Sequence, residues 1–364
     1  MLAVNSAHVL DAGLMLPKML PDILVTTTER VDRRLLPGFV VFDSGGFVFA
    51  LEGRYGEAER FLPKLIRIYR GVAAPKDLLI QLDLPLLPTQ GKELRKSLQR
   101  KNVVFYRRLV RVFGRRVIPV LHGWEEDEWE IQVEHIAGAR VVGIGSFFGF
   151  VSPPVKRVCN ALRLDPVLVA ERLVRVTRFA LNRLNTRLML LGGGSPKALY
   201  IAAVLGYEIA DSSTWRVAAF FGEVFHPRTL ERIKSSETLR HTDAFREAFE
   251  ELESSYGAPW SFEDWLALAK ERSRAGYIAR AWYNAMVAKL VQHRIEGVSE
   301  KRLVREMLRL YERSSRWRTI AKIVARSAHY MGFRIGLARY TPSMVRRAKG
   351  VKLWAFRGNG SAAL

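Results

Sequence analysis

The sequence predicts an α/β fold in which parallel strands alternate with helices. Short runs rich in Val, Ile and Leu recur along the chain, and amphipathic stretches lie between them. Near-continuous apolar runs are typical of strands that are buried on both faces of a parallel sheet covered by helices. Since 49% of the 364 residues are hydrophobic, the chain can also bury a large core.

The expected strands are, in order, 23–27, 39–42, 78–82, 117–121, 140–144, 188–191 and 207–210. Apolar residues at three- and four-residue spacing predict helices over 57–68, 91–113, 166–185 and 196–205. Ser195 is the expected N-cap of the last of these, with Pro196 at its first position. An eighth strand is expected just after Trp215, and a further helix over 262–296. This number and spacing of strands favours a TIM (β/α)8 barrel over an open sheet.

The barrel is expected to span residues 1–298, followed by a basic helical C-terminal extension over 299–364. Between positions 301 and 357 Lys and Arg recur throughout, whereas only Glu306 and Glu312 are acidic. The whole chain carries a formal charge of +22, which points to a polyanionic partner, nucleic acid first of all. A solvated cationic surface without a ligand is the alternative.

One helix face in the extension concentrates this charge, and we predict that it contacts the nucleic-acid backbone. Its arginines recur at three- and four-residue steps: Arg302, Arg305, Arg309, Arg313 and Arg316. Leu303, Met307, Leu308 and Tyr311 form the apolar face that docks the helix on the barrel.

The single cysteine, Cys159, allows neither a disulfide framework nor a Cys-rich zinc site within one chain. No zinc site is therefore expected; the sequence indicates no other metal and no cofactor. No stretch of about 20 apolar residues occurs, which argues against a membrane span, and residues 1–20 lack the basic start of a secretory signal. These observations predict a reducing, cytoplasmic compartment. The oligomeric state stays open, and a homodimer is one possibility.

Polar residues and glycines follow the expected strands directly. Because a barrel brings the carboxyl ends of its strands to one face, the residues that follow them converge there. The residues in question are Asp43, Asp83, His122, Gly143, Gly192 and Asp211. The Gly45-Gly46 pair lets the backbone pass close to a flat ligand, because glycine has no Cβ.

The stretch 41–47, Val-Phe-Asp-Ser-Gly-Gly-Phe, resembles a signature of the tRNA-guanine transglycosylase superfamily. The stretch 188–196 and the following 205–212 resemble its second signature. Between them, 81–83, 119–123 and 142–145 resemble its base-recognising Asp segment, its Val-Gln-Gly segment and its glycine pair. The resemblance covers about residues 20 to 296, in the same order and spacing.

The resemblance implies that the protein exchanges a guanine base in nucleic acid for a 7-deazaguanine derivative. Asp211 would attack C1′ of the nucleotide, Asp43 would carry a proton to the leaving guanine, and Asp83 would read the purine. The target nucleotide would be flipped or single-stranded. The base-binding residues would be Asp83, Gly45, Gly46, Phe47, His122, Gly143, Gly145, Gly192 and Trp215.

Departures from the family pattern shape this expectation. The three zinc-binding cysteines are missing, Tyr283 replaces the zinc-binding histidine, and His122 stands where glutamine usually contacts the base. Because RNA-binding modules are missing too, we favour DNA over tRNA as substrate. A non-catalytic nucleic-acid-binding paralogue and an unrelated barrel enzyme for phosphorylated small molecules are the other readings.

For several of these residues a purely structural role is the alternative to ligand binding. Asp83 precedes Leu84-Pro85, so it can simply shape a turn. A lone histidine such as His122 more often binds backbone than ligand. Phe47 and Trp215 can be core aromatics instead of stacking on the base.

Overall fold

A computed structural model describes residues 22–26, 33, 39–46, 49, 53–145, 164–193, 195–212, 214–237, 242–331 and 339–342. Phe47 and Cys159 lie outside these residues.

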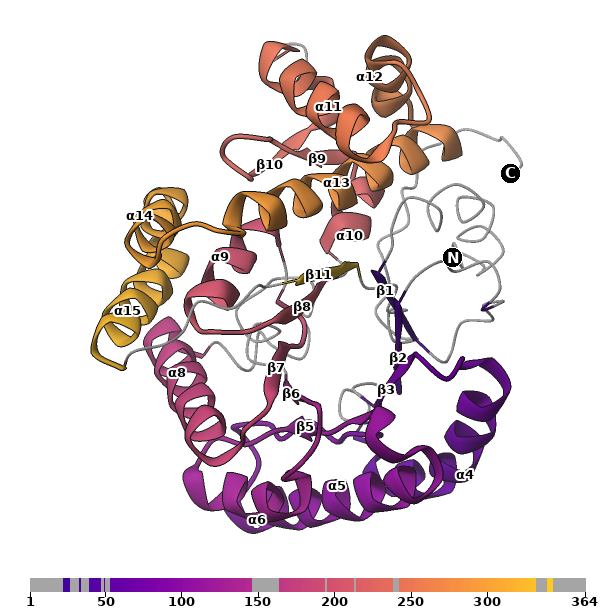
Figure 1. The fold of residues 1–364 in the computed structure, drawn as a ribbon, viewed down its shortest axis with the longest axis vertical. Coiled ribbons are helices and arrows are strands. Elements are labelled where there is room, and N and C mark those ends of the chain that lie inside the picture. The colour runs from indigo at the N-terminus through magenta and orange to yellow at the C-terminus, as the bar shows by residue number, and fades with distance from the viewer. Residues whose placement is uncertain are drawn as a thin grey trace.

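Two parallel sheets occupy the centre of the molecule, and helices lie on their outer side (Figure 1). The first sheet has the order β1 (Asp22–Thr26), β2 (Phe39–Asp43), β3 (Leu78–Ile80) and β4 (Val117–Ile118). The second has the order β11 (Arg339–Pro342), β8 (Ile209–Ser212), β7 (Arg187–Leu190), β6 (Val141–Ile144) and β5 (Val120–Leu121). The fold is therefore α/β with parallel strands, and all of the strands expected up to position 210 are confirmed.

The two sheets adjoin each other at both of their edges. At one edge only Pro119 separates β4 from β5, and its carbonyl accepts a hydrogen bond of 2.8 Å from the Gly143 N–H. Proline has no N–H to donate, so the ladder is interrupted at this residue. At the other edge β1 contacts β11. The chain thus passes from one sheet to the other without leaving the layer of strands.

The strands carry different residues on their two faces, because side chains alternate along a strand. One face forms a small cluster that consists of strand residues and includes Leu24, Val41, Ile80, Val120 and Ile209. The other face belongs to a much larger core that the helices complete. A strand residue in line with the small cluster therefore points away from the helices.

The helices expected up to position 205 are confirmed. They are α4 (Tyr55–Val72), α5 (Lys92–Phe113), α8 (Pro166–Arg183) and α9 (Pro196–Val204), and α6 (Glu126–Ile136) lies between α5 and α8. Pro63 lies inside α4 without ending it. Ser195 occupies the N-cap of α9 with proline next to it, although its side chain makes no capping hydrogen bond.

The expectation of an eighth strand just after Trp215 is wrong. Helix α10 (Thr214–Phe220) follows β8, and an antiparallel hairpin of β9 (Glu223–Phe225) and β10 (Arg232–Lys234) comes next. Trp215, Ala218 and Ala219 are buried at three- and four-residue spacing, which gives this stretch a helical apolar face. The strand beside β8 is instead β11, far downstream.

The single helix expected over 262–296 is divided in two. After α11 (Thr242–Tyr256) come α12 (Phe262–Lys270) and α13 (Arg274–Ile295). The side chain of Ser273 accepts a hydrogen bond from the Gly276 N–H and so caps α13. The cap therefore starts a new helix at Arg274, although the spacing of apolar residues alone predicts one continuous helix.

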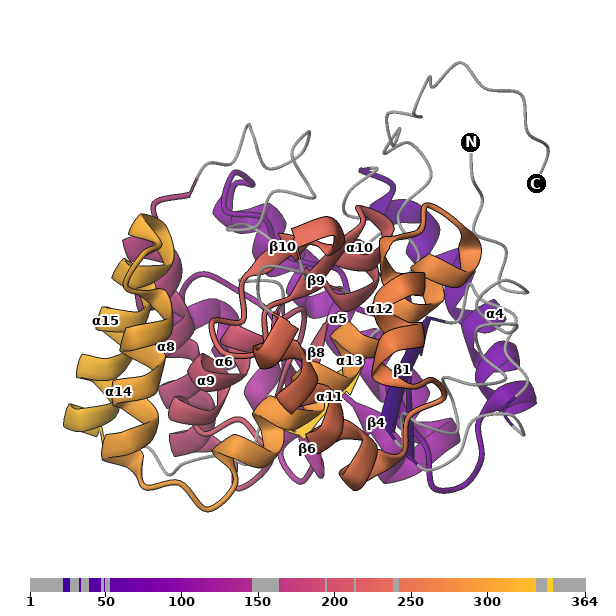
Figure 2. The same ribbon diagram turned by 90° about the horizontal axis from the view of Figure 1, so that it is seen from above.

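Two more helices, α14 (Glu300–Tyr311) and α15 (Ser315–Met331), follow. α14 packs on α9 and α15 packs on α8, and both lie along the outside of the strands (Figure 2). Leu303 and Met307 are buried, as the apolar face of α14 predicts. The boundary at residue 298 stays a prediction, but the layer of strands continues past it with β11. No helix in the described part of the chain is long and apolar enough to span a membrane.

Candidate active site

Asp43 and Asp211 lie at the carboxyl ends of β2 and β8, and their side chains point to the same face as the strand cluster. Asp43 follows Val41 by two residues, and Asp211 follows Ile209 by two. The period of two therefore directs both carboxyl groups away from the helices. Asp211 is 6% exposed and Asp43 is partly buried. Two acidic groups from non-adjacent strands thus lie at one end of the strand layer, close enough for the charge of Asp211 to raise the pKa of Asp43.

The pKa of Asp43 is raised to about 8 from its ordinary value of 3.8. Burial is the main cause, and the negative charges of Asp83 and Asp211 raise it further. Backbone N–H groups of Gly45 and Ser44 oppose the shift by favouring the ionised form. Asp43 therefore holds its proton at neutral pH, as a general acid requires.

The pKa of Asp211 is raised to about 7, again mainly by burial. The Gly192 N–H donates a hydrogen bond of 2.8 Å to Oδ1 of Asp211, which stabilises the carboxylate. The turn after β7 thus supplies a donor to the acid at the end of β8. Near neutral pH this carboxyl group can be ionised while Asp43 is protonated, which is the division of roles that an acid and a nucleophile need.

Asp83 lies after β3 and is held from two sides. Nε2 of His122, at the end of β5, lies 2.8 Å from its Oδ2, and the Ser44 hydroxyl donates to its Oδ1 at 3.2 Å. Asp83 is 7% exposed and His122 is 2% exposed. His122, which departs from the family pattern, is therefore the partner of Asp83, and Asp83 is not a solvent-exposed turn residue.

Two glycines permit these loops to approach each other. A Cβ on Gly46 would collide with the backbone carbonyl of Asp83, and a Cβ on Gly145 would lie 2.5 Å from the His122 ring. Neither space can hold a larger side chain without moving a site residue. Gly46 and Gly145 are thus needed for the positions of Asp83 and His122.

Amide side chains of α5 form hydrogen bonds to the loops that carry Asp83 and His122. Asn102 of α5 accepts a hydrogen bond from the Leu84 N–H at 2.8 Å and donates to its carbonyl at 3.1 Å. Gln99, one turn earlier, donates to the His122 carbonyl at 3.0 Å and to Gln132 at 2.8 Å. The sequence does not reveal these roles, because polar positions on an amphipathic helix carry no sign of inward orientation.

The side chain of Gln81 also lacks a role that its sequence position predicts. It is fully buried next to the end of β3, and neither its Oε1 nor its Nε2 has a hydrogen-bond partner among the described residues. A buried amide left unpaired costs about 1–3 kcal/mol. Gln81 precedes Asp83 by two residues, so its unpaired amide lies near the candidate site.

The structure does not bring every predicted residue to the site. Trp215 is 2% exposed and belongs to the large core, which is the role left open for it. Gly143 lies inside β6, where its backbone pairs with Val120, and Gly145 comes two residues later. Phe47 lies outside the described residues.

The arginines of the C-terminal segment lie apart from the carboxyl groups. Arg302, Arg305 and Arg309 are exposed on α14, and Arg313 is exposed in the turn after it. Arg316 lies in α15, but its side chain is outside the described part. α14 rests on α9, so these residues are on the outer, helical side of the fold.

No cluster of three or more His, Cys, Asp or Glu side chains suited to a metal ion occurs among the described residues. Tyr283, which the resemblance would place at the family's zinc-binding histidine, is fully buried, and its ring centre lies 4.4 Å from that of Trp265. An aromatic core thus occupies the region where the resemblance would put zinc.

We predict that the purified protein holds no stoichiometric zinc, because a structural site normally takes four ligands, commonly Cys and His. Elemental analysis after dialysis against a chelator measures this directly. One zinc ion per chain that survives the dialysis would contradict the prediction, and a zinc-loaded transglycosylase with its cysteines intact serves as the positive control.

Neither protein-family models nor curated proteins match this sequence. The resemblance described above therefore stays a prediction that depends on the motifs and on the geometry of the site.

Proposed function

We propose that the two sheets form one closed (β/α)8 barrel, with α14 and α15 on its outer side. Two observations support closure: β4 and β5 adjoin at Pro119, and β1 contacts β11 at the opposite edges. In such a barrel the small strand cluster is the interior, and Asp43, Asp83 and Asp211 lie at the carboxyl-terminal face, where barrel enzymes carry their active sites.

We further propose that the protein is a guanine transglycosylase, which replaces a guanine base in nucleic acid, DNA by preference, with a 7-deazaguanine derivative. The observation that carries the proposal is the placement of Asp43 and Asp211 on one face at the carboxyl ends of β2 and β8, with raised pKa values of about 8 and about 7. A protonated acid beside a carboxylate is the pair that retaining glycosyl transfer uses.

In the first half of the reaction the Asp211 carboxylate attacks C1′ of a flipped nucleotide. A C–O bond forms to Asp211, the C–N bond to guanine breaks, and Asp43 gives its proton to the departing base. In the second half Asp43 takes a proton from the incoming base, whose nitrogen attacks C1′ and releases the Asp211 carboxylate. Two inversions leave the configuration at C1′ unchanged.

The base is proposed to lie between the two acids and the Asp83–His122 pair. A carboxylate accepts hydrogen bonds from adjacent N–H donors, such as those on the Watson–Crick edge of guanine. The hydrogen bond of 2.8 Å to His122 and that of 3.2 Å from Ser44 orient the Asp83 carboxylate for this contact. His122 thus acts on the base through Asp83.

The test is release of labelled guanine. The protein is incubated in parallel with guanine-labelled DNA and tRNA, each with candidate 7-deazaguanines, and free label is measured with time. Release from DNA alone supports the proposal as stated, and release from tRNA alone assigns the same chemistry to the other substrate. If neither is released although both nucleic acids bind, the protein is a non-catalytic binding protein.

Replacing Asp83 by asparagine should raise the KM for the incoming base by about 10- to 100-fold, because the amide offers one acceptor and presents N–H groups to the N–H donors of the base. The kcat should change much less, since Asp83 takes no part in bond making. The control is Asp77→Asn, because Asp77 is a buried aspartate whose partner is Arg33. An Asp83→Asn variant with unchanged KM and lowered kcat would contradict the role.

A further inference from the structure

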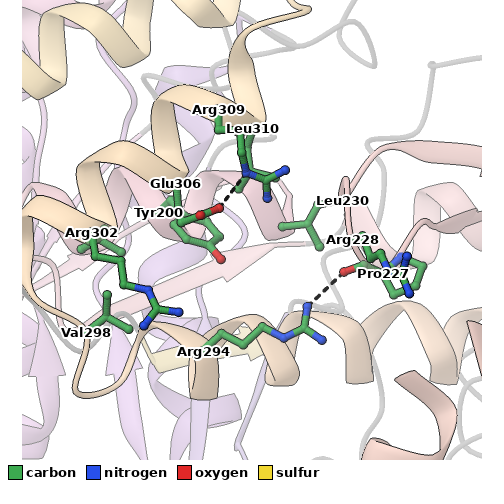
Figure 3. A pocket seen from close by; sticks show the side chains of 11 residues that line it. Tyr200, Pro227, Arg228, Leu230, Arg294, Val298, Arg302, Glu306, Arg309 and Leu310 are labelled. Atoms are coloured by element: carbon green, nitrogen blue, oxygen red, sulfur yellow. Dashed lines mark hydrogen bonds and ion pairs between the residues drawn. The ribbon is translucent and has the colours of Figure 1, made fainter. Parts of the chain in front are cut away.

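A pocket of about 400 Å³ lies away from the carboxyl groups, between α9, α13, α14 and the turn after β9 (Figure 3). Its lining is basic: Arg228, Arg294, Arg302 and Arg309 all contribute, and Glu306 is the only acidic residue among the described residues that line it. Arg302 and Arg309 come from α14, Arg294 from α13 and Arg228 from the turn after β9, so the charges reach the pocket from different sides (Figure 3). A cavity of this size can hold a small ligand.

The arginines of the pocket differ in how far their charge is already neutralised. Arg309 pairs with Glu306 at 2.8 Å, and Arg294 pairs with Glu251 at 3.1 Å. Arg228 pairs with Glu247 at 2.8 Å. Arg302 forms no ion pair or hydrogen bond within the described part of the chain, so its charge is left for a ligand. The other ion pairs are exposed and contribute little, so an anion can compete for their arginines.

The Tyr200 hydroxyl provides a second, independent observation. Tyr200 is 8% exposed, and in Figure 3 its hydroxyl points into the space between the arginines. No hydrogen bond of this hydroxyl is formed with any residue that the structure describes. Without a partner among those residues, this hydroxyl can form a hydrogen bond with a ligand that enters the pocket. The Tyr200 hydroxyl, from α9, and the Arg302 guanidinium, from α14, can then donate hydrogen bonds to the same anion.

The donors in this pocket suit a phosphate group. Guanidinium groups form charge-assisted, often paired hydrogen bonds to phosphate oxygens, and they are less strongly hydrated than ammonium groups. Leu230, Leu303 and Leu310 belong to the apolar part of the lining. The phosphate can belong to a nucleic-acid backbone or to a free phosphate compound.

We propose that this pocket is a phosphate-binding site, in which Arg302, Arg294 and the Tyr200 hydroxyl hold the phosphate oxygens. Where the phosphate is that of nucleic acid, the inference rests on the proposed function: α9, which carries Tyr200, begins just after the Gly192 turn that contacts Asp211. A nucleic acid bound at the carboxyl groups could then reach the pocket along α9.

Binding of inorganic phosphate to the full-length protein tests the site without any reference to catalysis. Equilibrium dialysis with labelled phosphate should give about one site per chain. Arg302→Gln should weaken binding about tenfold or more, and Tyr200→Phe should weaken it several-fold. The matched control is Lys301→Gln, which removes one positive charge from the adjacent, exposed position of α14. Thermal melting of each variant verifies that it is folded.

Anisotropy of a labelled oligonucleotide, measured over a range of salt concentrations, identifies the source of the phosphate. If the pocket holds a backbone phosphate, the slope of log K against log salt falls by about 0.9 for duplex or about 0.7 for single strands in Arg302→Gln. It stays the same in Lys301→Gln. Loss of phosphate binding in Arg302→Gln with an unchanged slope assigns the site to a free phosphate compound.

The proposal is overturned if the parent protein binds no stoichiometric phosphate, or if Lys301→Gln loses as much as Arg302→Gln. Guanine exchange is measured separately. A protein that binds phosphate in this pocket but releases no guanine would remove the proposed function and leave the phosphate site intact.

Discussion

Replacing Asp211 by asparagine is expected to abolish guanine exchange while nucleic-acid binding stays within about twofold of the parent. The amide keeps the size of the side chain but cannot form the ester bond to C1′, so no covalent intermediate accumulates. The effect should be the largest of any single substitution, about 10⁴-fold or more in kcat, because a missing nucleophile removes the entire covalent route. Label release at saturating substrate measures it.

The matched control is Asp264→Asn, which changes an exposed aspartate on α12. A covalent adduct trapped by denaturation should appear with the parent and with Asp264→Asn, and be absent with Asp211→Asn. If Asp211→Asn kept a tenth or more of the parental rate, another group would be the nucleophile. The nearby acids, Asp43 and Asp83, would be examined next by the same trapping experiment.

The two acids could be predicted from the sequence because their positions depend on local rules. Asp43 and Asp211 each follow a short apolar run, and parallel strands bring their carboxyl ends together. Alternation along the strand then fixes the direction of each side chain. Burial raises the pKa of both carboxyl groups, and the charges of Asp83 and Asp211 raise that of Asp43 further.

Other features depend on contacts that no local pattern contains. The pairing of β11 with β8 joins residues more than a hundred positions apart, and Arg339–Pro342 shows no long apolar run. The hydrogen bond of 2.8 Å between His122 and Asp83 likewise needs the spatial order of β3 and β5. The phosphate pocket combines α9, α13 and α14, so an arginine stripe on α14 indicated only part of it.

Asp43→Asn is expected to lower the exchange rate by roughly 10²- to 10⁴-fold, because the amide cannot give a proton to the leaving guanine. The parent should show a bell-shaped dependence of kcat/KM on pH. Activity should rise as Asp211 ionises, with a pKa of about 7, and fall as Asp43 loses its proton, with a pKa of about 8. Because the acids interact, the two limbs report the titration of the pair. In the variant the alkaline limb should disappear.

The same substitution has an effect on stability that needs no substrate. The pKa of Asp43 is about 8 in the folded state and near 3.8 in the unfolded state, so the unfolded chain releases this proton first as the pH rises. Between about pH 4 and pH 8 the unfolded state binds fewer protons, and the free energy of unfolding of the parent therefore falls. Asp43→Asn lacks this loss, so it should match the parent near pH 4 and be more stable at pH 8.

Urea unfolding at both pH values measures the difference in the free energy of unfolding between variant and parent. The control variant Asp264→Asn should show no such difference. An Asp43→Asn variant that is no more stable than the parent at pH 8 would mean that Asp43 is ionised in the folded protein, and could not then be the acid that protonates guanine.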